Sequence, residues 1–206
     1  MENSEQKNHW ENVYQNKQLT EVSWYQPTPK TSLDFIKAAN LPKNAAIIDI
    51  GGGDSFLTDH LLEEGYTNLS VLDISEKSLN RAKARLGQKE DLVKWIVSDI
   101  TEFRPESKYD LWHDRAAFHF LTSEDKINKY SVLTSSAIAP GGWLIMGTFS
   151  ENGPKKCSGL EIRQYAESSM NQVFQASFER VKCISEDHPT PFSTTQNFLF
   201  CSFKKR

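Results

Sequence analysis

The stretch Ile47-Ile48-Asp49-Ile50-Gly51-Gly52-Gly53-Asp54-Ser55 decides the fold class of this 206-residue chain. Its apolar first half, which begins at Ala45, predicts a short buried strand. The three glycines predict a tight turn into a helix that runs from about Ser55 to Glu64. Because glycine has no Cβ, a ligand can approach the backbone of such a turn closely. We therefore expect a ligand-binding turn where this strand ends.

Strand-like runs alternate with segments of helical period after this turn. Apolar runs predict strands at Leu69–Ile74, Leu92–Val97, Tyr109–His113 and Trp143–Phe149. One predicted helix begins after Ser75, a favourable N-cap, and another runs from about Ser123 to Ala139. This alternation predicts a parallel sheet that helices cover on both faces.

The end of the chain follows a different pattern. Two β-rich runs, Phe178–Glu186 and Asn197–Phe203, have no helix between them. A loop that contains His188-Pro189-Thr190-Pro191 joins the two runs. Consecutive strands without a crossover helix form a hairpin, so we expect the sheet to finish with an antiparallel strand.

Composition excludes several classes of protein. The 24 Lys+Arg residues against 27 Asp+Glu residues give a formal net charge of -3, which does not suit a protein that neutralises nucleic-acid phosphates. A hydrophobic fraction of 38% predicts a globular core, and the apolar runs are too short to span a membrane. Three widely spaced cysteines (Cys157, Cys183 and Cys201) fit neither a disulfide framework nor a metal site. With no leader-like segment at the polar N-terminus, these features predict a cytoplasmic protein without a metal.

Aspartates follow or end three of the predicted strands. Asp49 precedes the glycines, Asp73 ends the second strand, and Asp99 ends the third strand. The spacing of Asp73 from the glycine turn suits a carboxylate that accepts hydrogen bonds from ribose hydroxyls, and Asp99 is placed to meet an adenine amino group. The dinucleotide fingerprint would need glycine where Phe56 stands, which counts against a dehydrogenase.

These motifs, taken in order, resemble the class I S-adenosylmethionine (SAM)-dependent methyltransferases. The resemblance extends from about Ile47 to Phe149 and departs from the fullest form of the glycine loop at Ser55. The segments that carry it are Asp49-x-Gly51-x-Gly53, Asp73, Ser98-Asp99-Ile100, Tyr109–Leu121 and Ala139-Pro140-Gly141-Gly142-Trp143.

The resemblance implies a fold and a layout. The fold is a three-layer α/β sandwich with a mostly parallel seven-stranded Rossmann-like sheet and a C-terminal antiparallel hairpin strand. Residues 1–206 would form one domain. Residues 1–40 would be lid or cap helices, residues 45–149 the SAM-binding core, and residues 150–206 the substrate-side loops and the terminal hairpin.

The resemblance also implies a cofactor site for SAM, with S-adenosyl-L-homocysteine (SAH) as the product. Gly51 and Gly53 would line the methionyl end, Asp73 would hold the ribose, and Asp99 with the backbone of Ile100 would flank the adenine. His113 or Asp114 would face the sulfonium, and aromatic residues of the N-terminal segment would cover the cofactor. The expected cofactor-binding residues are Trp10, Tyr14, Tyr25, Asp49, Gly51, Gly52, Gly53, Asp73, Ile74, Asp99, Ile100, His113 and Asp114.

Residues over the methyl group come from loops at the same sheet edge. His188 is a candidate general base, Arg163 a candidate clamp for an acceptor carboxylate, and Cys157 a soft ligand or apolar wall. Tyr165 and Asp114 are placed on the same edge. A plainer interpretation makes Cys157 a packed thiol, Arg163 a surface ion pair and His188 a turn residue.

The acceptor is left open between a small molecule and a protein side chain, including lysine. A basic protein would suit the mild acidity, whereas a nucleic-acid base is not expected because His113-Asp114-Arg115-Ala116 stands where amino-group DNA methyltransferases carry Asn/Asp-Pro-Pro-Tyr. Two rivals from other classes are an NAD(P)-dependent oxidoreductase and a non-catalytic SAM-binding module. The oligomeric state is also left open.

Overall fold

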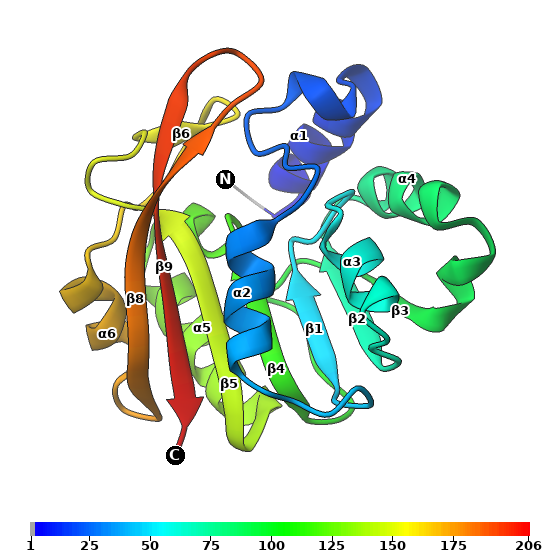
Figure 1. The fold of residues 1–206 in the computed structure, drawn as a ribbon. Helices are drawn as coiled ribbons and strands as arrows, with labels where there is room; N and C mark the ends of the chain where they lie inside the picture. Colours follow the sequence, from blue (N-terminus) through cyan, green and yellow to red (C-terminus); the bar gives the residue numbers. More distant parts are fainter. Residues whose placement is uncertain (1–2) are drawn as a thin grey trace.

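The computed structural model describes residues 3–206 and contains one seven-stranded sheet in the order β3-β2-β1-β4-β5-β9-β8 (Figure 1). The strands are β1 (Ile47–Ile50), β2 (Leu69–Asp73), β3 (Val93–Val97), β4 (Tyr109–Arg115), β5 (Ile138–Phe149), β8 (Phe178–Pro189) and β9 (Thr195–Lys205). The first five strands pair in parallel, and β9 lies antiparallel between β5 and β8. This arrangement confirms the predicted sheet with its antiparallel finish.

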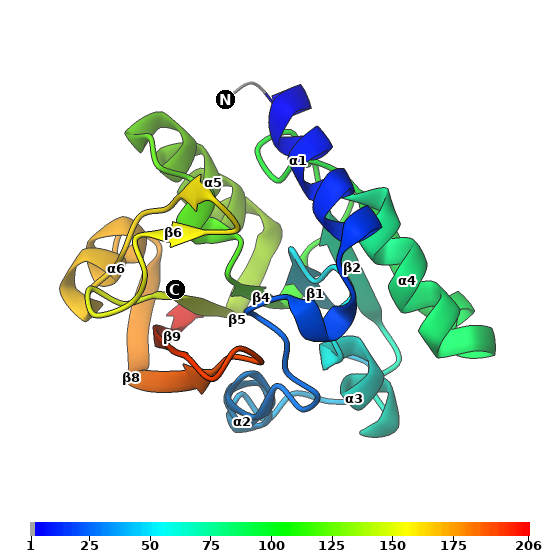
Figure 2. The same cartoon turned by 90° about the horizontal axis from the view of Figure 1, so that it is seen from above.

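Helices cover both faces of the sheet, as predicted (Figure 2). The helices are α1 (Asn3–Asn16), α2 (Lys30–Ala38), α3 (Leu57–Glu63), α4 (Glu76–Leu86), α5 (Glu124–Ala137) and α6 (Glu167–Phe174). Each face of the sheet packs against its helices through a hydrophobic core. Alternate residues of a strand contribute to the two cores, because successive side chains point to opposite faces. Ile47 and Leu111 pack with α2, α3 and α4, whereas Ile48 and Trp112 pack with α5 and α6.

The two helices of the N-terminal segment, α1 and α2, lie at different places on the sheet. Helix α1 lies at the upper edge of the sheet beside α4 (Figure 1), where the Glu11 carboxylate accepts a hydrogen bond from the backbone N–H of Glu76 at 2.7 Å. Helix α2 does not cover that edge. Phe35 and Ile36 bury it against the face of the sheet, so the prediction that residues 1–40 act as a cap is wrong for α2.

The terminal hairpin is longer than predicted. Strand β8 runs to Pro189 and β9 starts at Thr195, so His188 is a strand residue opposite Gln196 and not a loop residue. A two-stranded ribbon, β6 (Lys156–Cys157) and β7 (Leu160–Glu161), lies in the loop that follows β5.

Cys183 and Cys201 are direct cross-strand partners on β8 and β9, and a disulfide joins them. The expectation that the cysteines form no disulfide is therefore wrong. The positions of Cys183 and Cys201 on the two final β-rich runs predict core residues or cross-strand neighbours, and the register of the hairpin confirms that they are cross-strand neighbours. Within residues 3–206, no helix is long and apolar enough to cross a membrane.

Candidate functional site

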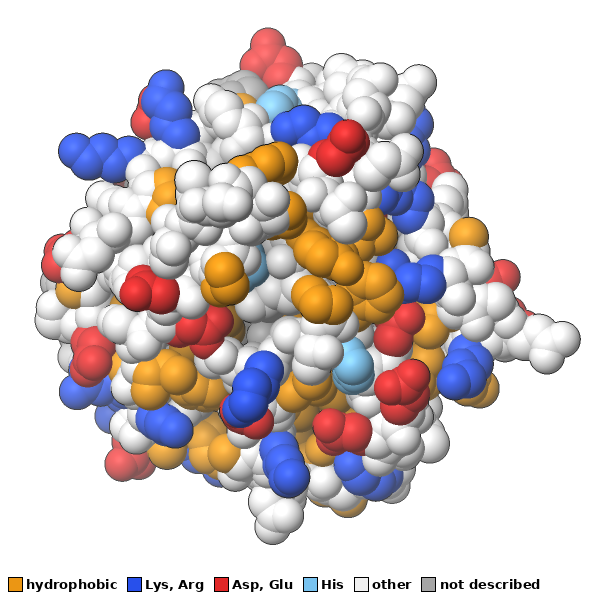
Figure 3. All heavy atoms as spheres, turned by 45° about the horizontal axis from the view of Figure 1, so that its top comes forward, with side chains coloured by type: hydrophobic (Ala, Val, Ile, Leu, Met, Phe, Trp, Pro, Cys, Tyr) orange, Lys and Arg blue, Asp and Glu red, His pale blue; other side chains and the backbone are white. Residues whose placement is uncertain are grey.

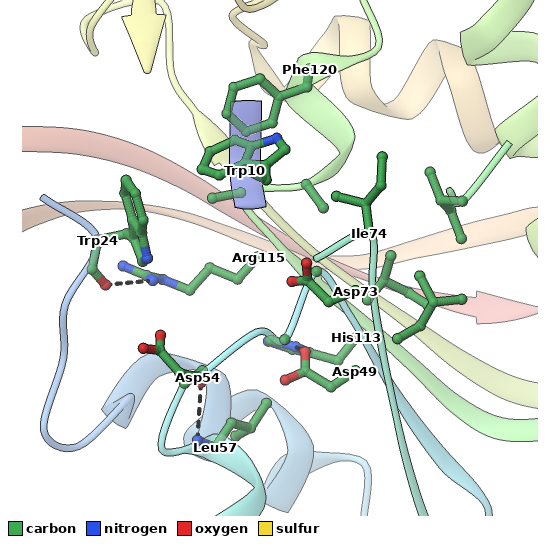
Figure 4. A pocket seen from close by; sticks show the side chains of 18 of the residues that line it. Trp10, Trp24, Asp49, Asp54, Leu57, Asp73, Ile74, His113, Arg115 and Phe120 are labelled. Atoms are coloured by element: carbon green, nitrogen blue, oxygen red, sulfur yellow. Dashed lines mark hydrogen bonds and ion pairs between the residues drawn. The ribbon is translucent and has the colours of Figure 1, made fainter. Parts of the chain in front are cut away.

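One pocket opens where the parallel strands end, between the sheet edge and the N-terminal segment. Hydrophobic side chains gather near the middle of this face of the molecule (Figure 3), and Figure 4 shows the residues inside. The pocket brings together most of the expected cofactor-binding residues: Trp10, Tyr14, Tyr25, Asp49, Gly51, Gly52, Asp73, Ile74, Asp99, Ile100 and His113.

The glycine turn is a close-packed cradle. Gly51 has φ +63°, and a Cβ on it would stand 2.6 Å from the Cβ of Ala117. Gly53 has φ +50°, and a Cβ there would lie 2.8 Å from the Tyr14 hydroxyl and 3.1 Å from the Asp73 carboxylate. Both positions need glycine, because a side chain would be strained in this backbone conformation and would collide with the pocket wall.

Two arginines of α4 brace the turn. Arg85 donates hydrogen bonds to the backbone carbonyls of Asp54 and Ser55, at 2.8 Å and 2.7 Å, and also binds the Asp59 carboxylate. Arg81 pairs with the Asp54 carboxylate at 3.0 Å and donates to the carbonyl of Tyr14. Neither arginine belongs to a motif that the sequence singles out. Their i, i+4 spacing on the helix after the second strand is the signal that would have found them.

Asp73 and Asp99 end or follow their strands with one oxygen committed to the backbone. The Asp73 Oδ1 accepts from the Ser75 N–H at 2.8 Å, and the Asp99 Oδ1 accepts from the Thr101 N–H at 2.8 Å. The second oxygen, Oδ2, of each carboxylate lies outside these backbone hydrogen bonds, and the Ser78 hydroxyl lies near the Asp73 carboxylate. Burial raises the pKa of Asp73 to about 7, because water no longer solvates the carboxylate. These oxygens are free to accept from a ligand.

A buried hydrogen-bonded chain lies beneath the glycine turn. His113 binds the Asp49 carboxylate through Nδ1 at 2.6 Å and the Ser32 hydroxyl through Nε2 at 2.9 Å. The Asp49 Oδ2 fills the space below Gly52, where a Cβ would stand 2.6 Å away. This chain fixes α2, β1 and β4 around the turn, and it occupies both nitrogens of the imidazole.

Aromatic rings from the N-terminal segment close the top of the pocket. Trp10 packs edge-on against Trp24 and Phe120, with ring centroids 5.7 Å and 5.2 Å apart. Tyr25 packs against Phe56 at 6.3 Å. The segment therefore lines the pocket and packs against the sheet-edge loops at the same time.

Among the catalytic candidates, Cys157 lines the pocket and Arg163 does not. Cys157 is a free, buried thiol, and burial raises its pKa to about 12. It is therefore a protonated wall of the pocket and not a nucleophile. Arg163 forms a hydrogen-bonded ion pair with Glu124 at the start of α5, on a partly exposed surface. The prediction that Arg163 clamps an acceptor is wrong for this arrangement.

His188 and Asp114 are committed to other groups. The His188 Nε2 contacts the Ser23 carbonyl at 2.8 Å, and Nδ1 contacts the Gln26 amide nitrogen at 3.3 Å. His188 thus holds the N-terminal segment and does not face the pocket as a base. Asp114 is fully buried and accepts hydrogen bonds from two backbone N–H groups after β4 and from the Tyr130 hydroxyl at 2.6 Å. It shapes that turn, which corrects its assignment to the sulfonium and to catalysis.

Tyr165 is also outside the pocket lining. Its ring is buried and stacks on Phe118, with centroids 5.2 Å apart. Arg115 at the end of β4 places a cationic side chain in the pocket lining. The sequence motif that contains Arg115 does not predict a role for it. Its Nη1 donates to the Trp24 carbonyl at 3.1 Å (Figure 4).

Comparisons with known proteins agree with this geometry. A sequence profile of the family described as "Methyltransferase domain" matches residues 48–144. A malonyl-[acyl-carrier protein] O-methyltransferase of Ilyobacter polytropus is 30% identical over 107 residues, which cover 52% of this chain and 40% of that enzyme. The match thus spans well under two thirds of that relative.

One further relative and one solved structure match along nearly the whole chain. An EEF1A lysine methyltransferase 2 of Danio rerio is 23% identical over 94% of this chain and 80% of its own length. The solved N-methyltransferase NodS of Bradyrhizobium japonicum, in complex with SAH, covers 100% of this chain and 99% of its own, with a TM-score of 0.75 and 15% identity. The structural likeness establishes the fold.

Proposed function

Since this chain belongs to the class I SAM-dependent methyltransferases, we propose that it transfers a methyl group from SAM to a small-molecule acceptor and releases SAH. The observation that carries this proposal is the pocket in which the glycine turn, Asp73 and Asp99 meet. A cradle that a Cβ would fill and two free carboxylate oxygens suit the methionyl, ribose and adenine parts of SAM.

Each part of the cofactor has residues that suit it. Asp73 would accept hydrogen bonds from the ribose hydroxyls, and Asp99 would accept from the adenine amino group beside Ile100. Gly51 and Gly52 would admit the methionyl end. The proposed cofactor core is residues 45–149, and within the pocket only Cys157 comes from residues 150–206.

When bound, SAM supplies an electrophilic methyl group on a positively charged sulfur. The protein aligns the acceptor with that methyl group and keeps water away. Trp10, Trp24 and Phe120 at the top of the pocket suit the exclusion of water, because their rings pack together. His113 is the only imidazole that lines the pocket within the described residues, and both of its nitrogens have partners. We therefore propose an acceptor whose lone pair is already free near neutral pH.

A protein side chain is the second candidate acceptor. The near full-length likeness to a lysine methyltransferase of Danio rerio favours it. The aromatic cover favours a small molecule, because a protein segment would have to displace Trp10 and Trp24 to reach the methyl group.

Transfer of radiolabelled methyl separates these possibilities. The protein and labelled SAM are incubated with a cell extract that ultrafiltration has divided into small molecules and macromolecules. We expect label in the small-molecule fraction. An Asp73→Ala variant, treated in the same way, measures the background. Label in protein alone would support the second candidate. No label above the Asp73→Ala background, with normal SAH binding, would identify a non-catalytic SAM-binding module.

A further inference from the structure

Arg115 is a cation inside the pocket that the proposed cofactor contacts do not use. Its guanidinium Cζ lies 4.9 Å from the centroid of the Phe198 ring, and Nη1 donates to the Trp24 carbonyl at 3.1 Å. Figure 4 shows the side chain extended toward the Trp24 backbone. A ring on one face and a carbonyl at one nitrogen fix the position of the planar group.

The other edge of the guanidinium has no partner. Nε and Nη2 of Arg115 are buried, and neither makes a hydrogen bond to any group within residues 3–206. Buried donors are normally paired, because an unpaired donor has lost its water without replacement. The N–H groups of Nε and Nη2 point in parallel and match the two oxygens of a carboxylate. This edge of Arg115 therefore presents a fork of two parallel, unpaired donors.

The acidic residues near Arg115 are already engaged. The Asp49 carboxylate binds His113, and the Glu186 carboxylate accepts a hydrogen bond from Thr31. Burial lowers the pKa of Arg115 to about 10, and the Glu186 and Asp49 carboxylates partly oppose this shift. Arg115 therefore stays charged at neutral pH, and an anion at the free edge must come from outside the protein.

The position of Arg115 points to the acceptor side of the pocket. Asp73 ends β2, and β1 separates β2 from β4, the strand that carries Arg115. Arg115 leans the other way, toward Phe198 on β9. Trp24 and Cys157 line the pocket near it with apolar surface. A ligand group here would be anionic at one end and apolar along its body.

We propose that Arg115 binds the carboxylate of the methyl acceptor, and that the acceptor is a small molecule that joins a carboxylate to an apolar body. The carboxylate is the handle that positions the acceptor. This inference rests on the proposed function, because it places the ligand beside bound SAM. The alternative source of the same chemistry is the methionyl carboxylate of SAM itself.

The test uses benzoate and hexanoate as probes, with benzamide and hexanamide as uncharged counterparts. The full-length protein is saturated with SAH, and each probe is titrated while the Nε–H signal of Arg115 is followed by NMR. Arg115→Lys identifies that signal by its loss. We expect saturable binding of at least one acid, about tenfold or more tighter than its amide, and a saturating shift of the Nε–H signal.

Variants then assign the preference to the fork. Arg115→Gln should weaken binding of the acid about ten- to a hundredfold, while Arg115→Lys should retain part of the affinity because the charge remains. SAH affinity should fall much less than affinity for the acid in both variants, although the contact with the Trp24 carbonyl is lost or altered, and retained SAH binding shows that the variants fold. Arg163→Gln, which removes an arginine outside the pocket, is the matched control and should change nothing.

Three results would overturn the inference. Acids that bind no better than amides would refute the carboxylate fork. An Arg115→Gln variant with unchanged affinity for the acid would remove Arg115 from the site. A loss of SAH affinity as large as the loss for the acid would assign the fork to the cofactor. If wild-type protein does not bind SAH, the proposed function fails, and the titration without SAH still decides whether Arg115 binds a carboxylate.

Discussion

The Asp49 carboxylate and the His113 Nδ1 lie 2.6 Å apart beneath the glycine turn, on residues that are direct partners in the β1–β4 ladder. Both residues are buried, with 5% of Asp49 and 2% of His113 exposed. A charge-assisted hydrogen bond in such a place is strong, because no water competes for it. The bond links Asp49 on β1 to β4, the strand that carries Arg115. It therefore stabilises the relative position of the glycine turn and Arg115.

Replacing His113 tests this support. His113→Phe keeps the ring volume but leaves the Asp49 carboxylate and the Ser32 hydroxyl without a partner. We expect a loss of about 2 kcal/mol or more in the free energy of unfolding, measured in urea. Glu106→Gln, which breaks an exposed ion pair with Lys94, is the control and should change stability by less than about 0.5 kcal/mol. If His113→Phe and Glu106→Gln change the free energy of unfolding equally, the buried bond between Asp49 and His113 stabilises the protein no more than an exposed ion pair.

Asp73 connects cofactor affinity to pH. Its pKa in the folded protein is about 7, against a reference value of 3.8, so the folded state holds its proton more tightly than the unfolded state. If only the carboxylate accepts from the ribose, SAH should bind about tenfold more weakly at pH 6 than at pH 8. Asp73→Asn should bind SAH more weakly at both values and lose this dependence. A wild-type affinity that does not change with pH would contradict the ribose assignment.

The same substitution has an opposite effect on stability. Because the raised pKa of Asp73 means that ionisation is costly in the folded state, its contribution to stability falls as the pH rises from about 4 to 7. Asp73→Asn should therefore stabilise the free protein by about 1–3 kcal/mol at pH 8 and have little effect near pH 4. Thermal unfolding at the two pH values measures the difference. Destabilisation at pH 8 would show that the carboxylate is needed for the fold.

Gly53 and Gly65 form a matched pair for the glycine cradle. Both have positive φ, +50° and +87°, but a Cβ on Gly65 would meet nothing within 4 Å. Alanine at either position should cost about 1–2 kcal/mol of stability because of backbone strain. Only Gly53→Ala should also weaken SAH binding, since its methyl would push against Tyr14 and Asp73. Calorimetry that finds equal SAH affinity for the two variants would remove Gly53 from the cofactor site.

His188 tests whether the N-terminal segment retains the cofactor. His188→Ala removes the contacts with the Ser23 carbonyl and the Gln26 amide, so we expect SAH to dissociate several-fold faster, as measured by stopped-flow fluorescence. His188→Gln keeps a donor for the Ser23 carbonyl and should restore part of the retention. If both variants lose turnover while SAH dissociates at the normal rate, His188 is a general base after all.

Local sequence predicted the fold because the strand-to-helix alternation and the glycine turn are both local patterns. It also predicted Asp49, Asp73 and Asp99, since the carboxyl ends of parallel strands meet at one edge. It failed where side-chain direction decides. Arg163 lies in the expected loop, whereas His188 lies on a strand where a loop was expected. The side chains of His188 and Arg163 bind Ser23 and Glu124 instead of facing the pocket.

The acceptor side was the harder part to predict. Arg115 gains its character from a ring on β9 and a carbonyl in the N-terminal segment, both far away along the chain. The sequence places Cys183 and Cys201 on neighbouring strands, but their disulfide depends in the same way on the register of the hairpin. Contacts between residues that are far apart along the chain depend on how the strands pair. The spacing of residues in the sequence does not predict them.

Calorimetric titration of the purified protein with SAH, with NAD as the parallel control, shows whether this pocket binds the proposed cofactor. We expect micromolar binding of SAH at one site, no binding of NAD, and a loss of affinity of about 1–3 kcal/mol in Asp73→Ala. Binding of NAD in place of SAH, or SAH affinity that is the same in Asp73→Ala, would contradict the assignment of this pocket to SAM.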